Sequence, residues 1–302
     1  MDQKRLWTLI LAFSSVYLFW GGTYLGMKIA LDSFPPFLMA GIRHFSAGLI
    51  LLTFALVKKE VKPQIREVFH GVVVGVLMLF LGNGLVAYAE LSVPSSIASL
   101  IVTTVPFWIV LLNGLFGEKK VPKRLEIFAL LLAFVGIILM VFQGQDLKVD
   151  ALDPFGIGLL LIASFSWATG SLYSRLMPVP KSSYYSIASQ TIGGSMVLFV
   201  FSFLIKDMHQ FSIQNITTAS FVAMVYLIIF GSVIAFSAYI WLMKNVSPTL
   251  ASSNAFVNPV VALFLGVVFA GEVLSQQSLL AAGIIIGAVV LLSFTKRTKK
   301  VQ

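Results

Sequence analysis

The chain has 302 residues, of which 58% are hydrophobic and only 11% are charged, and its formal net charge is +9. In soluble proteins about a quarter of the residues are charged, so this composition excludes an ordinary soluble domain and predicts an all-α membrane protein. The absence of cysteine excludes disulfides, thiol chemistry and thiolate metal sites. The basic residues lie in short segments between apolar runs, where they orient a membrane protein and do not indicate a nucleic-acid partner.

Apolar runs long enough to cross a bilayer follow one another along the whole chain. A membrane helix needs about 20 mainly apolar residues. The first run follows Lys4 and Arg5 and has no small-residue cleavage site, so we expect a retained span rather than a signal peptide. Ten spans are predicted, at residues 7–29, 36–57, 68–89, 94–116, 125–143, 155–176, 184–205, 219–243, 248–269 and 275–294.

The distribution of basic residues predicts the orientation of these spans. An even number of spans places both termini on one side of the membrane. If that side is the cytoplasm, 17 of the 21 basic residues lie in cytoplasmic segments, which is the arrangement that the positive-inside rule describes. We therefore expect a multi-pass protein of the cell membrane with both termini in the cytoplasm.

The stretch Val93–Glu118 has a second version at Val246–Glu272. Each copy begins at a proline, carries Ser or Thr on its first turns, has a further proline in mid-span and ends in Gly-Glu. When the copies are shifted by 153 positions, identical residues coincide at Val93/Val246, Ala98/Ala251, Ser99/Ser252, Pro106/Pro259, Leu112/Leu265 and Phe116/Phe269.

This repeat predicts two halves, residues 1–145 and 146–302, with five spans in each. Five is an odd number, so the second half enters the membrane from the opposite side. Such inverted repeats are typical of transporters, because exchanging the conformations of the two halves turns an inward-open state into an outward-open one.

Polar residues three, four or seven positions apart share a helix face, and inside a membrane such a face points to a protein interior or a cavity. Spans five and ten carry almost nothing polar in their middles, so we expect them to pack outside the other helices. Gly-x-x-x-Gly patterns at Gly22/Gly26, Gly71/Gly75 and Gly283/Gly287 predict close approach of neighbouring helices. The remaining spans predict a substrate cavity formed by Trp20, Tyr24, Arg43, Asn83, Ser99, Thr103, Trp167, Ser171, Asn254 and Asn258.

Arg43 gives the sharpest single signal, because a charge inside the bilayer is costly unless it is paired or hydrated. As a functional group it would hold an anionic or carboxylate part of a substrate. As a structural group it would pair with a glutamate or cap carbonyls at a kink. Proton coupling would rest on Glu90 or His44; the alternatives are a water-exposed interfacial carboxylate for Glu90, and packing or a local hydrogen bond for His44.

Pro106 and Pro259 each remove a backbone hydrogen bond and are predicted to kink their helices. Kinks at matching positions suit a moving gate, and they also suit a static bent helix. Trp20 and Trp167 occupy similar places in the two halves, in FWGGTY and SWATGS. They are interpreted either as paired aromatic walls of a cavity or as ordinary core residues.

No catalytic or nucleotide-binding motif is present in the sequence. It has no phosphate-binding loop of the Walker type, and none of its three histidines is spaced as a metal-binding pair. We therefore expect no enzyme activity, no cofactor and no metal. The expected partners are a small-molecule substrate and the lipid bilayer, and a homodimer is left open.

Several features together resemble the EamA family of the drug/metabolite transporter superfamily, and the resemblance covers essentially the whole chain. They are Trp20, Gly21 and Gly22 in the first span, Pro36 with Arg43 in the second, the helices of Pro106 and Pro259, and the Gly-Glu pairs that close the fourth and ninth spans. The resemblance implies ten helices in two inverted repeats, a central cavity lined by spans 1–4 and 6–9, and often export of amino acids or related metabolites.

The second half departs from the first at two points. Gln190 stands where the repeat would place Arg43, and Ala168 replaces the first glycine. The cavity is therefore expected to be symmetric in architecture and unequal in chemistry.

The predicted function is a secondary transporter that exports a small amphipathic metabolite, such as an amino acid or a derivative, by alternating access. One alternative is multidrug efflux of lipophilic compounds; a pump for lipophilic cations would want a buried carboxylate and no buried arginine. The other is an intramembrane enzyme or assembly factor, which would need clustered acids or histidines on facing helices.

Overall fold

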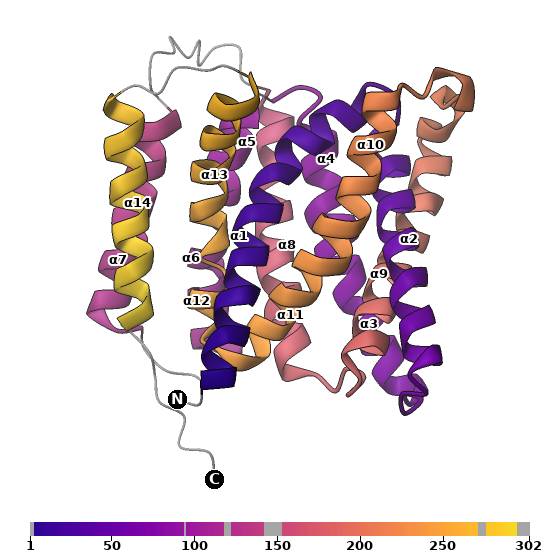
Figure 1. Cartoon of the computed structure of the whole chain (residues 1–302), viewed down its shortest axis with the longest axis horizontal. Helices are drawn as coiled ribbons and strands as arrows, with labels where there is room; N and C mark the ends of the chain where they lie inside the picture. The colour runs from indigo at the N-terminus through magenta and orange to yellow at the C-terminus, as the bar shows by residue number, and fades with distance from the viewer. Residues whose placement is uncertain (1–2, 94, 118–121, 142–152, 271–275, 295–302) are drawn as a thin grey trace.

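The computed structural model describes residues 3–93, 95–117, 122–141, 153–270 and 276–294, and these ranges form helices and connecting turns without a β-strand. Nine of the described helices are long and apolar enough to cross a membrane. The prediction of an all-α membrane protein is confirmed. In Figure 1, α1 begins and α14 ends at the same end of the bundle, which we call the terminal end; the opposite end is the distal end.

The first half of the chain forms the predicted spans in order, with two interruptions. The third span contains a π-helix, η1, and the fourth is broken at Thr103 and Thr104. Its elements are α1 (Gln3–Leu31), α2 (Pro36–Val57), α3 (Ile65–Gly75), η1 (Val76–Gly84), α4 (Leu85–Ala89), α5 (Ser95–Val102), α6 (Val105–Phe116) and α7 (Arg124–Val141).

The second half has the same two kinds of interruption. A π-helix, η5, lies in the eighth span, and the ninth is broken at Ser252 and Ser253. Its elements are α8 (Pro154–Leu176), α9 (Ser183–Leu204), the short η3 (Asp207–Gln210) and η4 (Ile213–Asn215), α10 (Thr218–Tyr226), η5 (Leu227–Ala235), α11 (Phe236–Asn245), α12 (Pro248–Ala251), α13 (Asn254–Ala270) and α14 (Gln276–Phe294).

The predicted count of ten spans and the inverted repeat stay predictions. Nine predicted spans coincide with the nine long apolar helices, and the predicted fifth span coincides with α7. The predicted boundary between residues 145 and 146 lies outside the described residues, as do Glu118 and Glu272.

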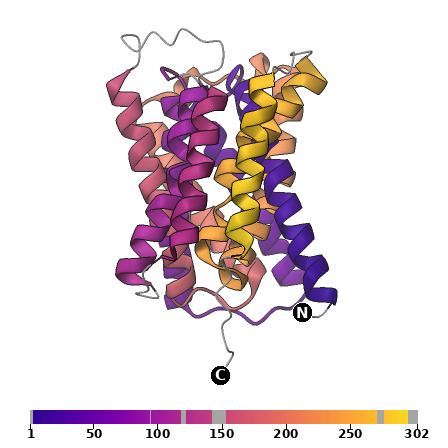
Figure 2. The ribbon, with the colours of Figure 1, turned by 90° about the vertical axis from the view of Figure 1, so that its left-hand side faces the viewer.

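The helices α7 and α14 stand apart from the other helices of the bundle. They pack against each other at one edge, as Figures 1 and 2 show. Their described residues are almost entirely apolar, which suits contact with lipid on the outside. The prediction that spans five and ten pack outside the other helices is confirmed.

Glycine packing brings α9 into close contact with α3. A Cβ atom added at Gly75 would lie 1.9 Å from the carbonyl oxygen of Gln190, so only glycine lets the two backbones approach this closely. The Gly22/Gly26 and Gly71/Gly75 patterns are confirmed at helix contacts. The Gly283/Gly287 pattern is wrong for the described part of the chain, where a Cβ at either residue would meet nothing within 4 Å.

The two π-helices have equivalent positions in the two halves, because both bounds of η5 lie 151 positions after those of η1. A π-helical turn interrupts the regular hydrogen-bond pattern of an α-helix and is frequent at functional sites. Here each π-helix has a carbonyl that accepts a side-chain hydrogen bond from another span. Leu77 O accepts from Ser166 Oγ at 2.9 Å, and Gly231 O accepts from Trp20 Nε1 at 2.9 Å.

Candidate substrate cavity

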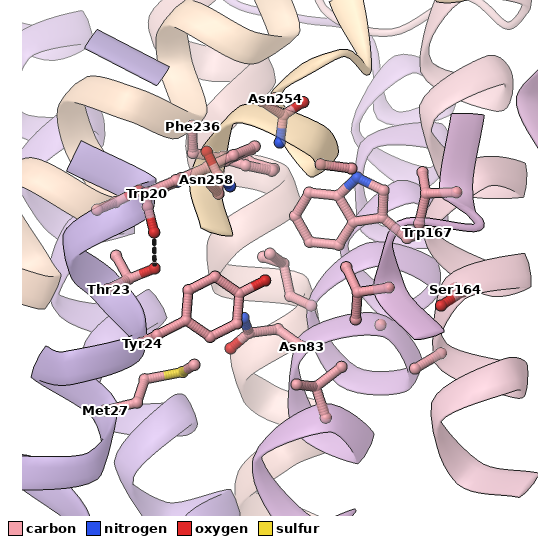
Figure 3. Close-up of a pocket in the computed structure, with 18 of the residues that line it drawn as sticks. Trp20, Thr23, Tyr24, Met27, Asn83, Ser164, Trp167, Phe236, Asn254 and Asn258 are labelled. Atoms are coloured by element: carbon pink, nitrogen blue, oxygen red, sulfur yellow. Dashed lines mark hydrogen bonds between the residues drawn. The ribbon is translucent and has the colours of Figure 1, made fainter. Parts of the chain in front are cut away.

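A cavity of about 100 Å³ lies inside the bundle, between residues of spans one to four, six, eight and nine. One water molecule needs about 10–15 Å³ by the same kind of measure, so the cavity has room for several waters or for a small solute group. On α1 its lining residues run from Trp20 to Met27, which places the cavity in the half of α1 nearer the distal end. Figure 3 shows Tyr24 of α1 and Trp167 of α8 pointing toward one another across it.

Seven of the ten residues predicted from helix faces line this cavity: Trp20, Tyr24, Arg43, Asn83, Trp167, Asn254 and Asn258. His44 lines it too. Ser99, Thr103 and Ser171 lie elsewhere. Thr103 is buried at the break between α5 and α6, where its Oγ1 donates to Leu100 O at 2.5 Å, and Ser99 is half-buried on α5. Ser171 lies below the cavity, toward the terminal end, where it meets Tyr239.

Span seven contributes no described residue to the cavity wall, although the resemblance implies that it should. Its helix α9 lies against α2 and α3 instead. The reason is the close glycine contact between α3 and α9, which leaves no space for a cavity between them.

The Arg43 guanidinium has one nitrogen that is hydrogen-bonded to a neighbouring span and another that has no hydrogen-bond partner among the described residues. Its side chain is only 3% exposed, and its Nε donates to Ser232 Oγ on η5 at 2.7 Å. Gly231 makes room for the guanidinium, because a Cβ there would lie 2.8 Å from Nη2. Nη1 has no hydrogen-bond partner among the described residues. A residue of the cavity lining therefore carries one guanidinium nitrogen without a hydrogen-bond partner among the described residues.

His44 and Asn83 join Arg43 and Ser232 in a cluster of polar side chains from spans two, three and eight. His44 Nδ1 lies 3.4 Å from Ser232 Oγ, and His44 Nε2 lies 3.5 Å from Asn83 Oδ1. Both distances are long for hydrogen bonds. The imidazole is therefore loosely held and can exchange these contacts for a ligand or a water.

Helix α13 contributes two side-chain amides, Asn254 and Asn258, to the cavity lining. Asn258 Oδ1 is buried and has no hydrogen-bond partner among the described residues. The Asn254 amide is satisfied locally when its nitrogen donates to Ala251 O at 3.1 Å and its oxygen accepts from Ala255 N at 3.3 Å. Asn258 thus supplies an unpaired acceptor in the same cavity as the unpaired donor of Arg43.

An aromatic cluster borders the cavity on the side nearer the terminal end. The rings of Trp20 and Trp167 meet edge to face, with centroids 5.5 Å apart. Beneath them the fully buried Tyr239 lies 5.1 Å from the Trp20 ring and 5.9 Å from the Trp167 ring. Its hydroxyl accepts from Trp167 Nε1 at 3.3 Å and is 2.8 Å from Ser171 Oγ.

Sequence reasoning missed the residues that the eighth span contributes. Gly231, Ser232 and Tyr239 belong to η5 and α11, which hold Arg43, Trp20 and Trp167 in place. The signal was present, since Ser232 and Tyr239 are seven positions apart and share a helix face. It was hidden by the strongly apolar residues around them.

The two prolines lie at different places relative to the helix breaks. Pro106 is in the first turn of α6, directly after the break at Thr103 and Thr104. Pro259 lies inside α13, six positions beyond the break at Ser253. Breaks and prolines both adjoin the cavity lining: Val102 and Val105 flank the break in one span, and in the other Asn254 follows the break while Asn258 precedes Pro259.

Glu90 does not line the cavity; it follows the last residue of α4, near the distal end. Its Oε1 is buried without a hydrogen-bond partner among the described residues. The described residues contain no group of three or more His, Cys, Asp or Glu side chains that could hold a metal.

Comparison with known proteins identifies the family. The EamA-like transporter family model matches residues 6–142 and again residues 154–294. The chain belongs to the EamA-like transporter family. This membership agrees with the apolar helices and the internal cavity, and the protein is a multi-pass membrane transporter.

Individual relatives agree with this family. The chain is 38% identical over 298 residues to the uncharacterized inner membrane transporter YedA of Escherichia coli, covering 98% of this chain and 94% of YedA. It is 24% identical to the uncharacterized transporter YoaV of Bacillus subtilis, over 97% of this chain and 99% of YoaV. A crystal structure with 18% sequence identity aligns with a TM-score of 0.77 over 96% of this chain and 99% of the other, and supports the fold.

Proposed function

We propose that this transporter exports a small amphipathic metabolite that carries an anionic group, such as an amino acid or a derivative, by alternating access. The observation that carries the proposal is Arg43, a buried arginine on the cavity wall whose Nη1 has no hydrogen-bond partner among the described residues. A carboxylate would pair with this guanidinium through charge-assisted hydrogen bonds.

The rest of the cavity favours a solute with both polar and apolar parts. The rings of Trp20, Tyr24 and Trp167 offer apolar faces, and the unpaired Asn258 Oδ1 can accept from an ammonium or hydroxyl group. A purely apolar compound would leave Arg43 and Asn258 unsatisfied, which costs free energy in a water-poor site. An inorganic anion would leave the aromatic faces unused.

Alternating access by two inverted halves is supported by paired structural features. The bounds of α9 lie 147 positions after those of α2, and those of η5 lie 151 positions after those of η1. Contacts are paired in the same way: α1 packs on α13 as α8 packs on α6. In transporters built from inverted repeats, rocking of one half against the other exposes the central site alternately to the two sides.

The orientation and the direction of transport belong to the proposal. The positive-inside rule favours cytoplasmic termini, which would make the distal end the outer one. Export is proposed by analogy with the EamA-like transporter family. A homodimer is also part of the proposal, and the molecular mass of the purified protein tests it.

Proton coupling is a second part of the proposal and rests on Glu90 and His44. His44 lines the cavity, and Glu90 has a buried oxygen without a hydrogen-bond partner among the described residues. A double variant, Glu90→Gln with His44→Ala, should lose the pH dependence of transport in proteoliposomes. An unchanged pH dependence in that variant contradicts proton coupling through these groups.

The lining residues disfavour an efflux pump for lipophilic cations. No Asp or Glu is among the described residues that line the cavity, and Arg43 would repel a cation there. An intramembrane enzyme is disfavoured by the family membership and by the lack of an acid or histidine cluster among the described residues.

The decisive experiment compares the solutes in the medium of three strains: a deletion strain, a strain overexpressing the protein, and one overexpressing Arg43→Gln to the same level. We expect one solute with an anionic group to accumulate outside the strain with the unchanged protein and not outside the other two. If no solute differs, the export proposal is wrong. If Arg43→Gln exports the solute equally well, the assigned role of Arg43 is wrong.

A further inference from the structure

Spans six and eight are joined by hydrogen bonds on the side of the cavity nearer the terminal end, and we call the residues Ser171, Arg175 and Tyr239 the clasp. Tyr239 on α11 is 0% exposed, and its hydroxyl meets Ser171 Oγ on α8 at 2.8 Å. One turn further along α8, Arg175 Nη1 donates to Met243 O at 2.5 Å and to Val246 O at 2.8 Å. Side chains of α8 thus hold α11 at its middle and at its end.

The repeat assigns each member of this clasp a counterpart near the distal end. Trp167 corresponds to Trp20, 147 positions earlier, and the same shift pairs Ser171 with Tyr24 and Arg175 with Lys28. The shift of 151 positions that relates η5 to η1 pairs Tyr239 with Tyr88. The counterparts therefore lie on α1 and α4, in the half of the bundle nearer the distal end.

The counterpart clasp is open in this structure. Tyr88 is 37% exposed, and its ring packs against Phe37 of α2, with centroids 5.4 Å apart, rather than against α1. Lys28 is exposed, whereas Arg175 is bonded to the end of span eight. Among the described residues α8 packs against α11 through the clasp, whereas α1 and α4 share only the apolar cluster that contains Met27, Ala30 and Ala87.

We propose that Tyr239 and Tyr88 are the paired latches of two alternating gates: Tyr239 closes the terminal end through Ser171, and Tyr88 closes the distal end through Tyr24. The inference rests on the proposed alternating access and adds the residues that carry it. In the state shown, the terminal gate is closed and the distal gate is open. In the other state, Tyr239 leaves Ser171, and Tyr88 turns from Phe37 toward Tyr24 of α1.

This assignment gives the two tyrosines opposite effects on one equilibrium. Loss of the Tyr239 hydroxyl removes hydrogen bonds that exist only when the terminal gate is closed, so it favours the state open at the terminal end. Loss of the Tyr88 hydroxyl removes a bond that forms only in that second state. A neutral hydrogen bond contributes about 1 kcal/mol, so each change should shift the ratio of the two states about five-fold, in opposite directions.

The chain has no cysteine, so one engineered thiol can report which state is present. Val86 lines the cavity, and its counterpart 151 positions later is Ser237. The probe is a membrane-impermeant maleimide, applied to proteoliposomes from one side at a time. Val86→Cys should react from the distal side, and Ser237→Cys should react slowly from the terminal side.

The test adds Tyr→Phe changes to the Ser237→Cys protein. Tyr239→Phe should raise the reaction rate from the terminal side about five-fold, and Tyr88→Phe should lower it by a similar factor. Ser171→Ala removes the same bond as Tyr239→Phe from the other partner and should also raise the rate. The matched control is Tyr184→Phe, because the Tyr184 hydroxyl bonds to Lys58 at the surface, away from both gates.

Two negative results have different meanings. If Tyr239→Phe and Ser171→Ala both give rates within two-fold of the Tyr184→Phe control, the gate proposal is overturned while alternating access stands. If Ser237→Cys reacts from the terminal side in no variant, yet reacts after denaturation, while Val86→Cys reacts from the distal side, alternating access itself is overturned. Equal effects of Tyr239→Phe and Tyr88→Phe in the same direction also contradict the pairing.

Discussion

The helices α2 and α9 are the same length, 22 residues each, yet only one of them lines the cavity. Arg43 on α2 and Gln190 on α9 are 147 positions apart and occupy equivalent places. Arg43 reaches across to Ser232 on η5, whereas Gln190 is fully buried where α9 meets Gly75 of α3.

The difference between the two contacts explains where the cavity forms. At Gly75 the backbones of α3 and α9 touch directly, and no volume is left between them. Between α2 and η5 a long arginine side chain fills the contact, and its head group borders an open space. The comparison shows that the helix positions are shared by the two halves, while side-chain size decides which helix pair opens a site.

Replacing Arg43 of α2 by the glutamine that α9 carries should have the largest effect on transport. Arg43→Gln gives α2 the residue that α9 carries and removes the charge that we assign to the substrate. Truncating one partner of a buried charge pair costs about 2–5 kcal/mol of binding, so transport at low solute concentration should fall at least about thirty-fold. The measurement is uptake or export of the solute identified in the medium comparison.

Two controls separate substrate binding from folding in that experiment. The thermal midpoint of Arg43→Gln should stay equal or rise, because a buried charge with an unpaired nitrogen is removed. Gln190→Ala should leave transport nearly unchanged, since Gln190 lies away from the cavity. A fall in midpoint that accounts for the lost transport contradicts a direct role for Arg43.

Disturbing the close contact of α9 should affect folding rather than transport chemistry. A Cβ at Gly75 would lie 1.9 Å from Gln190 O, so Gly75→Ala must push α3 and α9 apart. Overpacking of this kind costs about 1–3 kcal/mol and occasionally more. The midpoint of thermal unfolding in detergent should fall, and less monodisperse protein should be recovered.

The matched control is Gly283→Ala on α14, where a Cβ meets nothing within 4 Å among the described residues. Alanine is the better helix former by about 1 kcal/mol, so this variant should be as stable as the unchanged protein or slightly more stable. Equal destabilisation by both substitutions contradicts the packing argument for Gly75.

The sequence predicted the features that depend on composition and spacing along one helix. Apolar runs set the spans, and shared faces brought Trp20, Tyr24, Arg43 and Asn83 together around one cavity. What it could not predict depends on how helices approach one another. The spacing of polar residues along one helix does not predict that α9 packs against Gly75 of α3 and lies away from the cavity.

The π-helices are the other feature that sequence reasoning missed. Residues 76–84 and 227–235 are at least as apolar as the neighbouring helical segments, so neither a change in period nor a fall in apolar character marks them. In each π-helix a backbone carbonyl accepts a hydrogen bond from a side chain of another span, as Gly231 O does from Trp20 Nε1. Such a change is decided by tertiary contacts, which is why Ser232 and Tyr239 were not among the predicted site residues.

The serines that hydrogen-bond to Arg43 and Gln190 allow a test of the same comparison with a smaller expected effect on transport. Ser232→Ala removes the acceptor of Arg43 Nε, and hydrogen bonds to charged groups contribute about 1.5–3 kcal/mol. Transport should fall about ten-fold, and Ser232→Thr, which keeps a hydroxyl, should restore most of it. Ser186→Ala removes the 3.2 Å bond from Gln190 Nε2 and should lower stability slightly without changing transport. Equal transport by both alanine variants contradicts the assigned difference.

The smallest expected effect concerns Asp207, which joins the two helices directly. It follows α9 and accepts from Phe37 N at 3.0 Å and Leu38 N at 3.2 Å, so it caps the first turn of α2. An N-terminal cap contributes about 1 kcal/mol, and Asp207→Ala should lose about that much. By contrast, α9 is capped by its own Ser182, whose Oγ accepts from Tyr185 N.

Acid should show how burial and capping compete at Asp207. Burial raises the pKa of this carboxyl above its ordinary value of 3.8, although the N–H groups of Leu38 and Phe37 act against the rise. The folded state therefore holds the proton more tightly than the unfolded state, and the contribution of Asp207 to stability is largest below pH 3.8 and falls as the pH rises through the folded-state pKa. Asp207→Asn keeps an acceptor oxygen but cannot titrate, so the thermal midpoint of the unchanged protein relative to this variant should decrease from about pH 4 to about pH 7. A relative midpoint that increases over this range would mean that the first turn of α2 stabilises the carboxylate more than burial disfavours it, and the link between α9 and α2 would then be electrostatic.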